Sequence, residues 1–467
     1  MKFDNYFIPL HSVYRITSKK QAEMKVELAR HYGYKQIIIT AIPSIVMMLV
    51  ISVYSIVDGL FVSNYAGTTP FAAINLMWPA FMLIGALGIM VGTGGSALVA
   101  KTMGEGNRDE ANRIFSMLVK VTIIGGILLS IVFLLLLRPL AILLGAEGQL
   151  LTDSLIYGGI LTVFLTPFLL QMLFQPIFMT AERPTLGTRM SIVCGLINMF
   201  FDFIFIAVFH WGITGAAIAT IMGFSVGGFY PLYYFASKRN KSSLRLVKVD
   251  KINWSYIRQT CFNGSSEYVS NIALSVVSIC YNSQLIHFMG ENGVAAYGIL
   301  MYMAYLFAAV FIGYNISISP IISYHYGAGH KGELHSLLVK SLVVVGITGT
   351  LLTLTSELTV GPTSAIFVGY DPELFALTKR AYAIYMVSFM LFGINFFVSA
   401  FFTALNNGIV SAAAAFTRTM IFEVGSVFLL PLLFGIDSIW WSVDLADLLA
   451  LIMSVILLKR FRRRYGY

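Results

Sequence analysis

Charged residues are scarce in this sequence. Only 11% of the 467 residues are Asp, Glu, Lys or Arg, whereas 58% are hydrophobic. Soluble domains contain about 25% charged residues, so this chain lacks the polar side chains that a water-facing surface of its size requires. The composition excludes an ordinary soluble protein and indicates an integral membrane protein.

Cysteines and the motifs of common enzymes are also scarce. Cys194, Cys261 and Cys280 lie in apolar stretches without paired spacing, which argues against a disulfide framework or a zinc site. The sequence has no HExxH motif, no nucleophile elbow and no paired aspartates of an intramembrane protease, and no Walker lysine follows the glycine-rich "GTGGSA" at 92–97. We therefore expect no enzymatic activity, no cofactor and no ATP-driven step.

Long apolar runs, by contrast, are abundant. Twelve of them recur along the chain, each long enough to cross about 30 Å of hydrocarbon. They lie near 36–63, 72–100, 114–137, 155–180, 190–209, 213–236, 259–288, 294–322, 337–356, 381–404, 409–434 and 437–458. We expect an all-α integral membrane protein with twelve transmembrane helices.

The basic residues lie mostly on one side of these predicted spans. Of the 31 Lys and Arg residues, 25 fall in the two tails and in the loops on the same side. Because cytoplasmic loops are rich in Lys and Arg, we place both termini in the cytoplasm and the protein in the cell membrane, surrounded by lipid. The net charge of +9 thus reflects orientation, and we expect no nucleic-acid partner.

A repeat at a constant offset of 223 residues divides the chain into halves. Gly67 matches Gly290, "MGEG" at 103–106 matches "YGAG" at 326–329, and "GI" at 212–213 matches "GI" at 435–436. Each half holds six spans, so both halves enter the membrane in the same direction. We expect two parallel six-helix bundles with pseudo-two-fold symmetry, a plan in which transporters carry substrate between the halves.

The expected units follow from this division. They are a cytoplasmic N-terminal segment at 1–35, an N-lobe at 36–236, a basic cytoplasmic linker at 237–258, a C-lobe at 259–458 and a basic cytoplasmic tail at 459–467. The first segment is either an amphipathic helix on the inner leaflet or a disordered tail. The linker is either a solvated loop or a contact for anionic lipid. One chain holds a whole two-lobe pathway, so a monomer is sufficient.

Polar side chains in the N-lobe spans meet at one depth. Asp58 lies near the outer end of span 1, in "SVYSIVDGLFVSNYAG", and Asn198 and Asp202 are one helical turn apart in span 5. Thr220 in span 6 lies roughly 10 Å below the outer end, as do both aspartates at about 1.5 Å per residue. Intramembrane ionisable residues are candidate functional sites.

These four groups suit a small cation. Carboxylate, amide and hydroxyl oxygens bind Na⁺, and two adjacent carboxylates disfavour double ionisation, so the pair can instead hold a proton. The alternative interpretation is that the aspartates are satisfied by hydrogen bonds and only hold helices together.

Other ionisable residues in the spans are secondary candidates. Glu267 lies early in span 7, where a helix-end role is favoured over coupling, and Arg418 and Glu423 lie five residues apart in span 11, where pairing within the bundle, either directly or through another span, is favoured over substrate contact. Structural pairing is also the plainer interpretation for Asp444 and Asp447 in span 12.

Aromatic and methionine side chains are candidates for the wall of a substrate cavity, because broad apolar walls suit amphipathic cations. They are Tyr54, Met77, Trp78, Met82, Tyr281, Met301 and Met303. The alternative for each is packing in the core or against lipid.

Several stretches resemble the multidrug and toxic compound extrusion (MATE) family. They are "YSIVDGLFVSNYAG", "GTGGSALVAKTMGEGNRDEANRIF", the "NxxxD" of span 5 and "GITGAAIAT", and the likeness extends over nearly the whole chain. In the family branch with a cation site in the N-terminal lobe, the positions matching Asp58, Asn198, Asp202 and Thr220 hold the coupling proton or sodium ion. The resemblance implies the same site here. Another branch relies on acidic residues in spans 7 and 10, and span 10 of this chain has none.

We predict a secondary active multidrug efflux transporter. It would export amphipathic or cationic small molecules in exchange for H⁺ or Na⁺ by alternating access, with Pro43 in "AIPS" as a bend point whose replacement by Ala should alter transport. The main alternative is a lipid-linked oligosaccharide flippase of related two-lobe architecture. Such a flippase needs a cationic cavity for pyrophosphate, and the spans hold almost no Lys or Arg besides Lys120, Lys340 and Arg418.

Overall fold

The computed structural model describes residues 27–369 and 371–467, and the regular elements in these ranges are all helices. The N-terminal half contains α2 (Tyr34–Phe61), η1 (Val62–Ala66), α3 (Thr68–Gly104), α4 (Arg108–Leu143), α5 (Gly148–Val163), α6 (Leu165–Thr180), α7 (Pro184–Asp202), η2 (Phe203–Val208) and α8 (Gly212–Ala236). The C-terminal half contains α9 (Trp254–Gly327), α10 (Lys331–Val368), α11 (Pro372–Tyr385), η3 (Met386–Ser388), α12 (Phe389–Ala404), α13 (Gly408–Phe416), η4 (Thr417–Glu423), α14 (Val424–Phe434), η5 (Ile436–Trp441) and α15 (Ser442–Tyr465).

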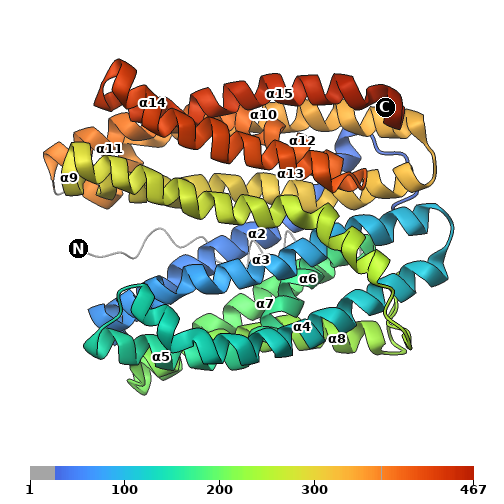
Figure 1. The fold of residues 1–467 in the computed structure, drawn as a ribbon, viewed down its shortest axis with the longest axis horizontal. Helices are drawn as coiled ribbons and strands as arrows, with labels where there is room; N and C mark the ends of the chain where they lie inside the picture. The colour runs from blue at the N-terminus through green and yellow to red at the C-terminus, as the bar shows by residue number, and fades with distance from the viewer. Residues whose placement is uncertain (1–26, 370) are drawn as a thin grey trace, which may run out of the picture.

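The two halves form two layers of helices that run along the same long axis. Figure 1 shows α2–α8, in blue to green, as one layer and α9–α15, in yellow to red, as the other.

Polar residues begin several of these helices. Asn107, for example, accepts a hydrogen bond from the Glu110 N–H at the start of α4. Asp371 accepts from the N–H groups of Glu373 and Leu374 at the start of α11, whose first residue is Pro372.

Helix α9 contains two membrane crossings. Its 74 residues would extend about 110 Å as one straight helix, far more than a bilayer is thick. Gly290 interrupts it with φ 63° and ψ −153°, and the chain turns back there. The Tyr281 and Tyr297 rings consequently stack with centroids 4.8 Å apart, although sixteen residues separate them.

Helices α5 and α6 form one bent crossing. They meet at an angle of 60°, and Pro167 explains the break, because it has no N–H to donate to the carbonyl of Val163 at the end of α5. The described residues hold ten helices long and apolar enough to span a membrane, besides this pair. Counting the pair as one and α9 as two gives the twelve crossings that the sequence predicts.

The internal repeat is visible in the backbone. Gly67 precedes α3 with φ 104°, and its partner Gly290 has the same left-handed sign of φ at the corresponding hairpin. Gly106 and Gly329, at φ 83° and 71°, form the second such pair. Only glycine adopts these conformations without strain, so the repeated glycines fix equivalent turns in the two halves. The predicted pseudo-symmetric fold of two six-helix bundles is confirmed.

One contact between the lobes is symmetric residue by residue. A Cβ atom at Gly104 would collide with the carbonyl oxygen of Tyr324, and one at Gly327 would collide with that of Lys101. Gly104 and Gly327 are 223 residues apart, as are Lys101 and Tyr324. The ends of α3 and α9 thus cross on the pseudo-two-fold axis, with backbone against backbone.

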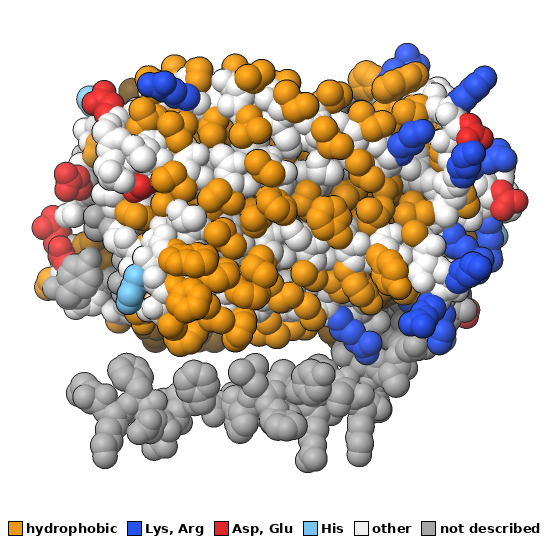
Figure 2. Space-filling view, turned by 90° about the horizontal axis from the view of Figure 1, so that it is seen from below, with side chains coloured by type: hydrophobic (Ala, Val, Ile, Leu, Met, Phe, Trp, Pro, Cys, Tyr) orange, Lys and Arg blue, Asp and Glu red, His pale blue; other side chains and the backbone are white. Residues whose placement is uncertain are grey.

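The molecule has one strongly basic end. Figure 2 shows hydrophobic side chains over the middle of the visible face and Lys and Arg side chains gathered at the end where the C-terminus lies in Figure 1. We call this the basic end; it includes the linker and the last turns of α15, with Arg462, Arg463 and Arg464. Helix α15 continues through the predicted tail as far as Tyr465.

The lobes are held together at the basic end. Ser317 of α9 donates to the Thr40 carbonyl (3.3 Å) and bonds to Ser44 of α2 (2.8 Å). Asn406 Nδ2 donates to the Ala97 carbonyl of α3 (3.5 Å). The hydrogen bonds between the lobes that involve described residues all lie in this half of the molecule, and we call this contact region the seam.

Candidate cation and substrate site

The four polar residues singled out in the N-lobe come together around one cavity. Asp58 of α2, Asn198 of α7 and Thr220 of α8 line a hollow of about 150 Å³. Asp202, the last residue of α7, is fully buried beside it and interacts with the Asp58 carboxyl group. Helical spacing puts Asn198 and Asp202 on one face, and the packing of α2 and α8 on α7 brings the other two to that face.

Most of the oxygens of this cluster have no protein donor. Oδ1 of Asp58, both carboxylate oxygens of Asp202 and Oδ1 of Asn198 are buried and have no hydrogen-bond partner among the residues that the structure describes. Buried acceptors without a donor cost free energy. A bound proton or cation would satisfy them, so the donor set fits either ligand.

Thr220 of α8 adds a hydroxyl oxygen to the lining of the cavity. Its Oγ1 donates to the Ala216 carbonyl one turn earlier, at 2.9 Å. The hydrogen is thereby directed back into α8, so towards the cavity the oxygen acts as an acceptor.

Tyr157 of α5 belongs to this cluster, although its sequence carries no motif. It is 1% exposed, lines the cavity, and interacts with Thr220, Asp58 and Asp202. A depth count could have found it, because it lies nine residues, roughly 14 Å, from the start of α5 at the same end of the molecule. Gln171 of α6 and Asn75 of α3 also line the cavity. The sequence does not predict them, because they too carry no motif.

The remaining wall of the cavity is aromatic. Of the seven candidate substrate-cavity residues, Tyr54 and Trp78 line it, together with Phe71 and Phe224. The other five pack elsewhere. Met77 is fully buried in the N-lobe core with Met82 against it, Tyr281 is fully buried in the C-lobe core, and Met301 and Met303 pack against that core.

The ionisable residues of the C-lobe form a separate cluster. Arg418 Nε donates to Asp447 Oδ1 at 2.6 Å, and Asn395 Nδ2 donates to the same oxygen at 3.1 Å. Glu423 is 5% exposed, and both carboxylate oxygens of Asp444 are buried without a hydrogen-bond partner in the described part of the chain. Arg418 is therefore paired with another span, α15, and takes no part in the N-lobe cavity.

Glu267 lies deeper than its sequence position indicates. Helix α9 begins at Trp254, five residues before the predicted span, so Glu267 is thirteen residues, or about 20 Å, along the helix. It is half-buried, three residues from Gly264, which packs against the Met90 carbonyl across the seam.

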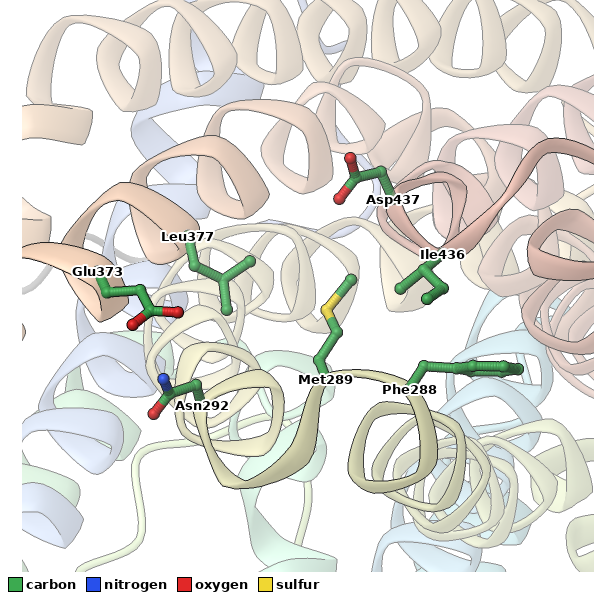
Figure 3. A pocket seen from close by; sticks show the side chains of 7 residues that line it. All are labelled: Phe288, Met289, Asn292, Glu373, Leu377, Ile436 and Asp437. Atoms are coloured by element: carbon green, nitrogen blue, oxygen red, sulfur yellow. The ribbon is translucent and has the colours of Figure 1, made fainter.

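A second hollow, of about 460 Å³, lies in the C-lobe at the end opposite the basic end. Figure 3 shows its lining side chains, which come from α9, α11 and η5 and include Glu373 and Asp437. Asp437 is already paired with Arg380 at 2.8 Å. None of the predicted site residues lines this hollow.

Among residues 27–369 and 371–467, no group of three or more His, Cys, Asp or Glu side chains is arranged to hold a metal ion. Sodium at the aspartate pair would therefore depend on amide and hydroxyl oxygens in addition to the two carboxylates.

Comparison with known proteins gives a consistent result. The sequence profile of the MatE family matches residues 43–204 and 268–429, once in each lobe. The multidrug export protein MepA of Staphylococcus haemolyticus is 22% identical over 436 residues, covering 92% of this chain and 94% of that protein. MepA of Staphylococcus aureus (strain NCTC 8325) is 22% identical over 437 residues with the same coverage. A structure described as the outward-facing conformation of a multidrug resistance MATE family transporter superposes with a TM-score of 0.89 at 20% identity, covering 95% of this chain and 99% of that one.

Proposed function

The chain belongs to the MatE family of transporters, and we propose that it is a secondary active multidrug exporter driven by H⁺ or Na⁺. In this proposal Asp58, Asn198, Asp202 and Thr220 bind the coupling cation, and amphipathic or cationic small molecules are the exported substrates. The protein acts as a transporter and not as an enzyme.

The observation that carries the proposal is that several buried oxygens in the N-lobe cavity accept no hydrogen bond from the part of the chain that the structure describes. Two carboxylates, an amide and a hydroxyl from three helices gather at one cavity, and four of their oxygens have no hydrogen-bond partner among the described residues. The aromatic wall of the same cavity offers apolar surface and π-faces to an organic cation. One cavity thus offers surfaces for both a small cation and a substrate.

The closed seam supports alternating access. We propose that the basic end faces the cytoplasm, in agreement with the distribution of Lys and Arg. With the lobes joined there, the conformation seen here is closed to the cytoplasm. Cation binding from outside and substrate binding from inside would then favour opposite conformations, which is the condition for exchange.

A pyrophosphate-binding flippase is not favoured. Neither Lys nor Arg lines the N-lobe cavity. The cations within the spans are used elsewhere: Lys120 and Lys340 donate to backbone carbonyls, and Arg418 is paired with Asp447.

The first experiment measures efflux of ethidium from cells that carry the wild type, Asp58→Asn or Asp202→Asn, under imposed Na⁺ or pH gradients. We expect both variants to lose gradient-driven efflux, by at least tenfold, because an amide cannot exchange a proton or neutralise a cation. The gradient that drives the wild type identifies the coupling ion.

Asp153→Asn is the matched control. Asp153 is also a buried aspartate of the N-lobe (5% exposed), but its Oδ1 already accepts from Gln149 Nε2 at 2.8 Å. It should retain efflux. Wild-type efflux by both cavity variants at normal membrane levels would show that the aspartates are structural.

A further inference from the structure

The chain segment that precedes α2 is tied to both lobes at the basic end. Leu28 and Tyr32 of this segment, residues 27–33, are 0% and 2% exposed. The Leu28 N–H donates to Glu182 Oε1 in the N-lobe (3.1 Å), and the Tyr32 N–H donates to Glu333 Oε1 in the C-lobe (3.0 Å). A short segment, with a turn at residues 28–29, therefore bridges the seam.

The attachment to the C-lobe has three polar contacts. Besides the Tyr32 N–H bond, His31 Nδ1 lies 2.6 Å from Glu333 Oε2, and Lys340 Nζ donates to the Tyr32 carbonyl at 2.7 Å. Glu333 is thus bound through both of its oxygens. Because the segment continues directly into α2 of the N-lobe, opening of the basic end would break all three contacts.

We propose that residues 27–33 form a latch that stabilises closure of the basic end, and that protonation of His31 strengthens it through Glu333. This inference rests on the proposed function, because it assumes that the lobes separate at this end during transport. Under that function, an acidic cytoplasm would slow the return to the cytoplasm-open state.

The charges around His31 fix the sign of the effect. Imidazole changes its charge between about pH 5 and 8, and the side chain of His31 is 71% exposed to solvent. A protonated ring forms an ion pair with Glu333, whereas a neutral ring can donate only an uncharged hydrogen bond, which is weaker. Acidification should therefore favour the latched conformation.

Other titratable and charged groups face the latch from each neighbouring element. They are Glu27 and Arg30 on the segment itself, Glu182 from the N-lobe, His325 and His330 at the end of α9, and Lys340 of α10. The His325 and His330 rings share a contact of 3.1 Å between their Nδ1 atoms. Both rings belong to the C-lobe, so their contact does not cross the seam, and the test must isolate His31 by its own substitution.

Spin-label distance measurements on the full chain in lipid nanodiscs can isolate it. Labels at Asp109 of α4 and Arg460 of α15, both exposed near the basic end, with the three native cysteines replaced by serine, report the separation of the lobes at pH 8 and pH 6. For the wild type we expect the ratio of closed to open populations to rise about two- to fivefold at pH 6, the range of a partly exposed ion pair.

Three variants test the residues. Glu333→Gln should lower the closed population at both pH values and abolish the change with pH. His31→Gln should remove only the change with pH, and His31→Arg should remain in the pH 6 distribution at pH 8. His335→Gln is the matched control, because His335 is an exposed histidine two residues from Glu333 that forms no hydrogen bond or ion pair with the described residues 27–33, and it should behave as the wild type.

The proposal would be overturned if the closed population of His31→Gln and Glu333→Gln still changed with pH as it does in the wild type. It would also be overturned if Glu333→Gln had the same distance distribution as the wild type. The distances are measured without transport. If Asp58→Asn and Asp202→Asn both export normally, the cation site is wrong and the latch can still hold; if the lobes never separate at the basic end in any condition, the latch fails.

Discussion

The ammonium groups of two lysines in the apolar spans donate hydrogen bonds to backbone carbonyls. Lys120 Nζ donates to the Val249 carbonyl of the linker at 3.1 Å, and Lys340 Nζ donates to the Tyr32 carbonyl at 2.7 Å. A lysine stem can lie along apolar surface while its charged end reaches a polar group. Each lysine therefore attaches a non-helical segment to a lobe, and neither serves the cavity.

Tyr157 and Thr220 should act as one unit in cation binding. We expect Tyr157→Phe and Thr220→Val each to raise the cation concentration for half-maximal efflux roughly two- to tenfold, the equivalent of about 0.5–1.5 kcal/mol for a hydrogen bond. Because the two hydroxyls interact, the effects of the two substitutions should not add. The double variant should require no higher a cation concentration for half-maximal efflux than the more impaired of the two single variants. Efflux titrations against Na⁺ or pH measure both effects.

Tyr314→Phe is the control for that cycle. Tyr314 donates to Ser341 Oγ at 2.8 Å in the C-lobe, so its replacement removes a similar bond far from the cavity and should leave the titration unchanged. Fully additive effects of the Tyr157 and Thr220 substitutions would contradict a shared role.

Spacing and depth predict part of the candidate site from the sequence. Asn198 and Asp202 were grouped by helical spacing, and Asp58 and Thr220 were added because they lie at a similar depth. Tyr157 was not found, because the chain has 24 tyrosines and an uncharged side chain in an apolar run gives no signal of its own. The pairing of Arg418 with Asp447 depends on how α15 packs, which spacing within one helix cannot reveal.

At the scale of helices, π-helical segments accompany the ionisable residues. Among the described residues these segments are η1, which begins four residues after Asp58, η2, which begins directly after Asp202, and η4, which contains Arg418 and Glu423. A π-helical turn redirects side chains relative to an α-helix and is frequent at functional sites. The same device thus occurs at the polar clusters of both lobes.

The Arg418–Asp447 pair should be a major contributor to C-lobe stability. Asp447 is 0% exposed, and Arg418 also lies over the Phe392 ring at 4.6 Å. We expect Asp447→Asn or Arg418→Met to destabilise the protein by about 3–5 kcal/mol, because each leaves one buried charge unpaired. Thermal unfolding of the detergent-purified protein measures the loss.

The exposed pair of Lys248 and Asp250 provides the comparison. Their side chains are 90% and 78% exposed, so Asp250→Asn should leave the unfolding temperature unchanged. An equal effect of Asp250→Asn and Asp447→Asn would contradict the argument from burial.

Helix positions were predicted better than helix ends. Hydrophobic length locates the spans, but it does not detect the bend that Pro167 introduces between α5 and α6 or the continuation of α15 through its basic last turns to Tyr465. Basic residues at the end of a helix continue it beyond the hydrocarbon, but hydropathy locates only the apolar part of the helix. The start of α11 before its predicted span has the same origin, since Asp371 and Pro372 are good helix starters but are not apolar.

At the scale of the whole molecule, closure of the basic end depends on residues without side chains. We expect Gly104→Leu or Gly327→Leu to open the seam, because overpacking of such a contact costs about 1–3 kcal/mol and should lower the closed population at least fivefold. Alkylation of Ala97→Cys by a hydrophilic maleimide measures the opening, since Ala97 is 1% exposed in the closed seam. Transport should fall in parallel.

Gly125→Leu controls for the loss of glycine itself. Gly125 lies inside α4, and a Cβ atom there would meet nothing within 4 Å among the described residues. It should leave alkylation and transport unchanged. Slow, wild-type alkylation in a well-expressed Gly104→Leu protein would show that the seam does not depend on this contact.

The contact between Gly104 and Tyr324 and its mirror between Gly327 and Lys101 have the form of an isologous interface. In such an interface the same patch appears on both partners and is self-complementary. Each lobe therefore carries, at one end of its second helix, a surface that matches its own copy. A six-helix half-chain with this surface would already be able to assemble as a symmetric homodimer, and fusion of two copies into one gene would free each half to acquire its own polar cluster.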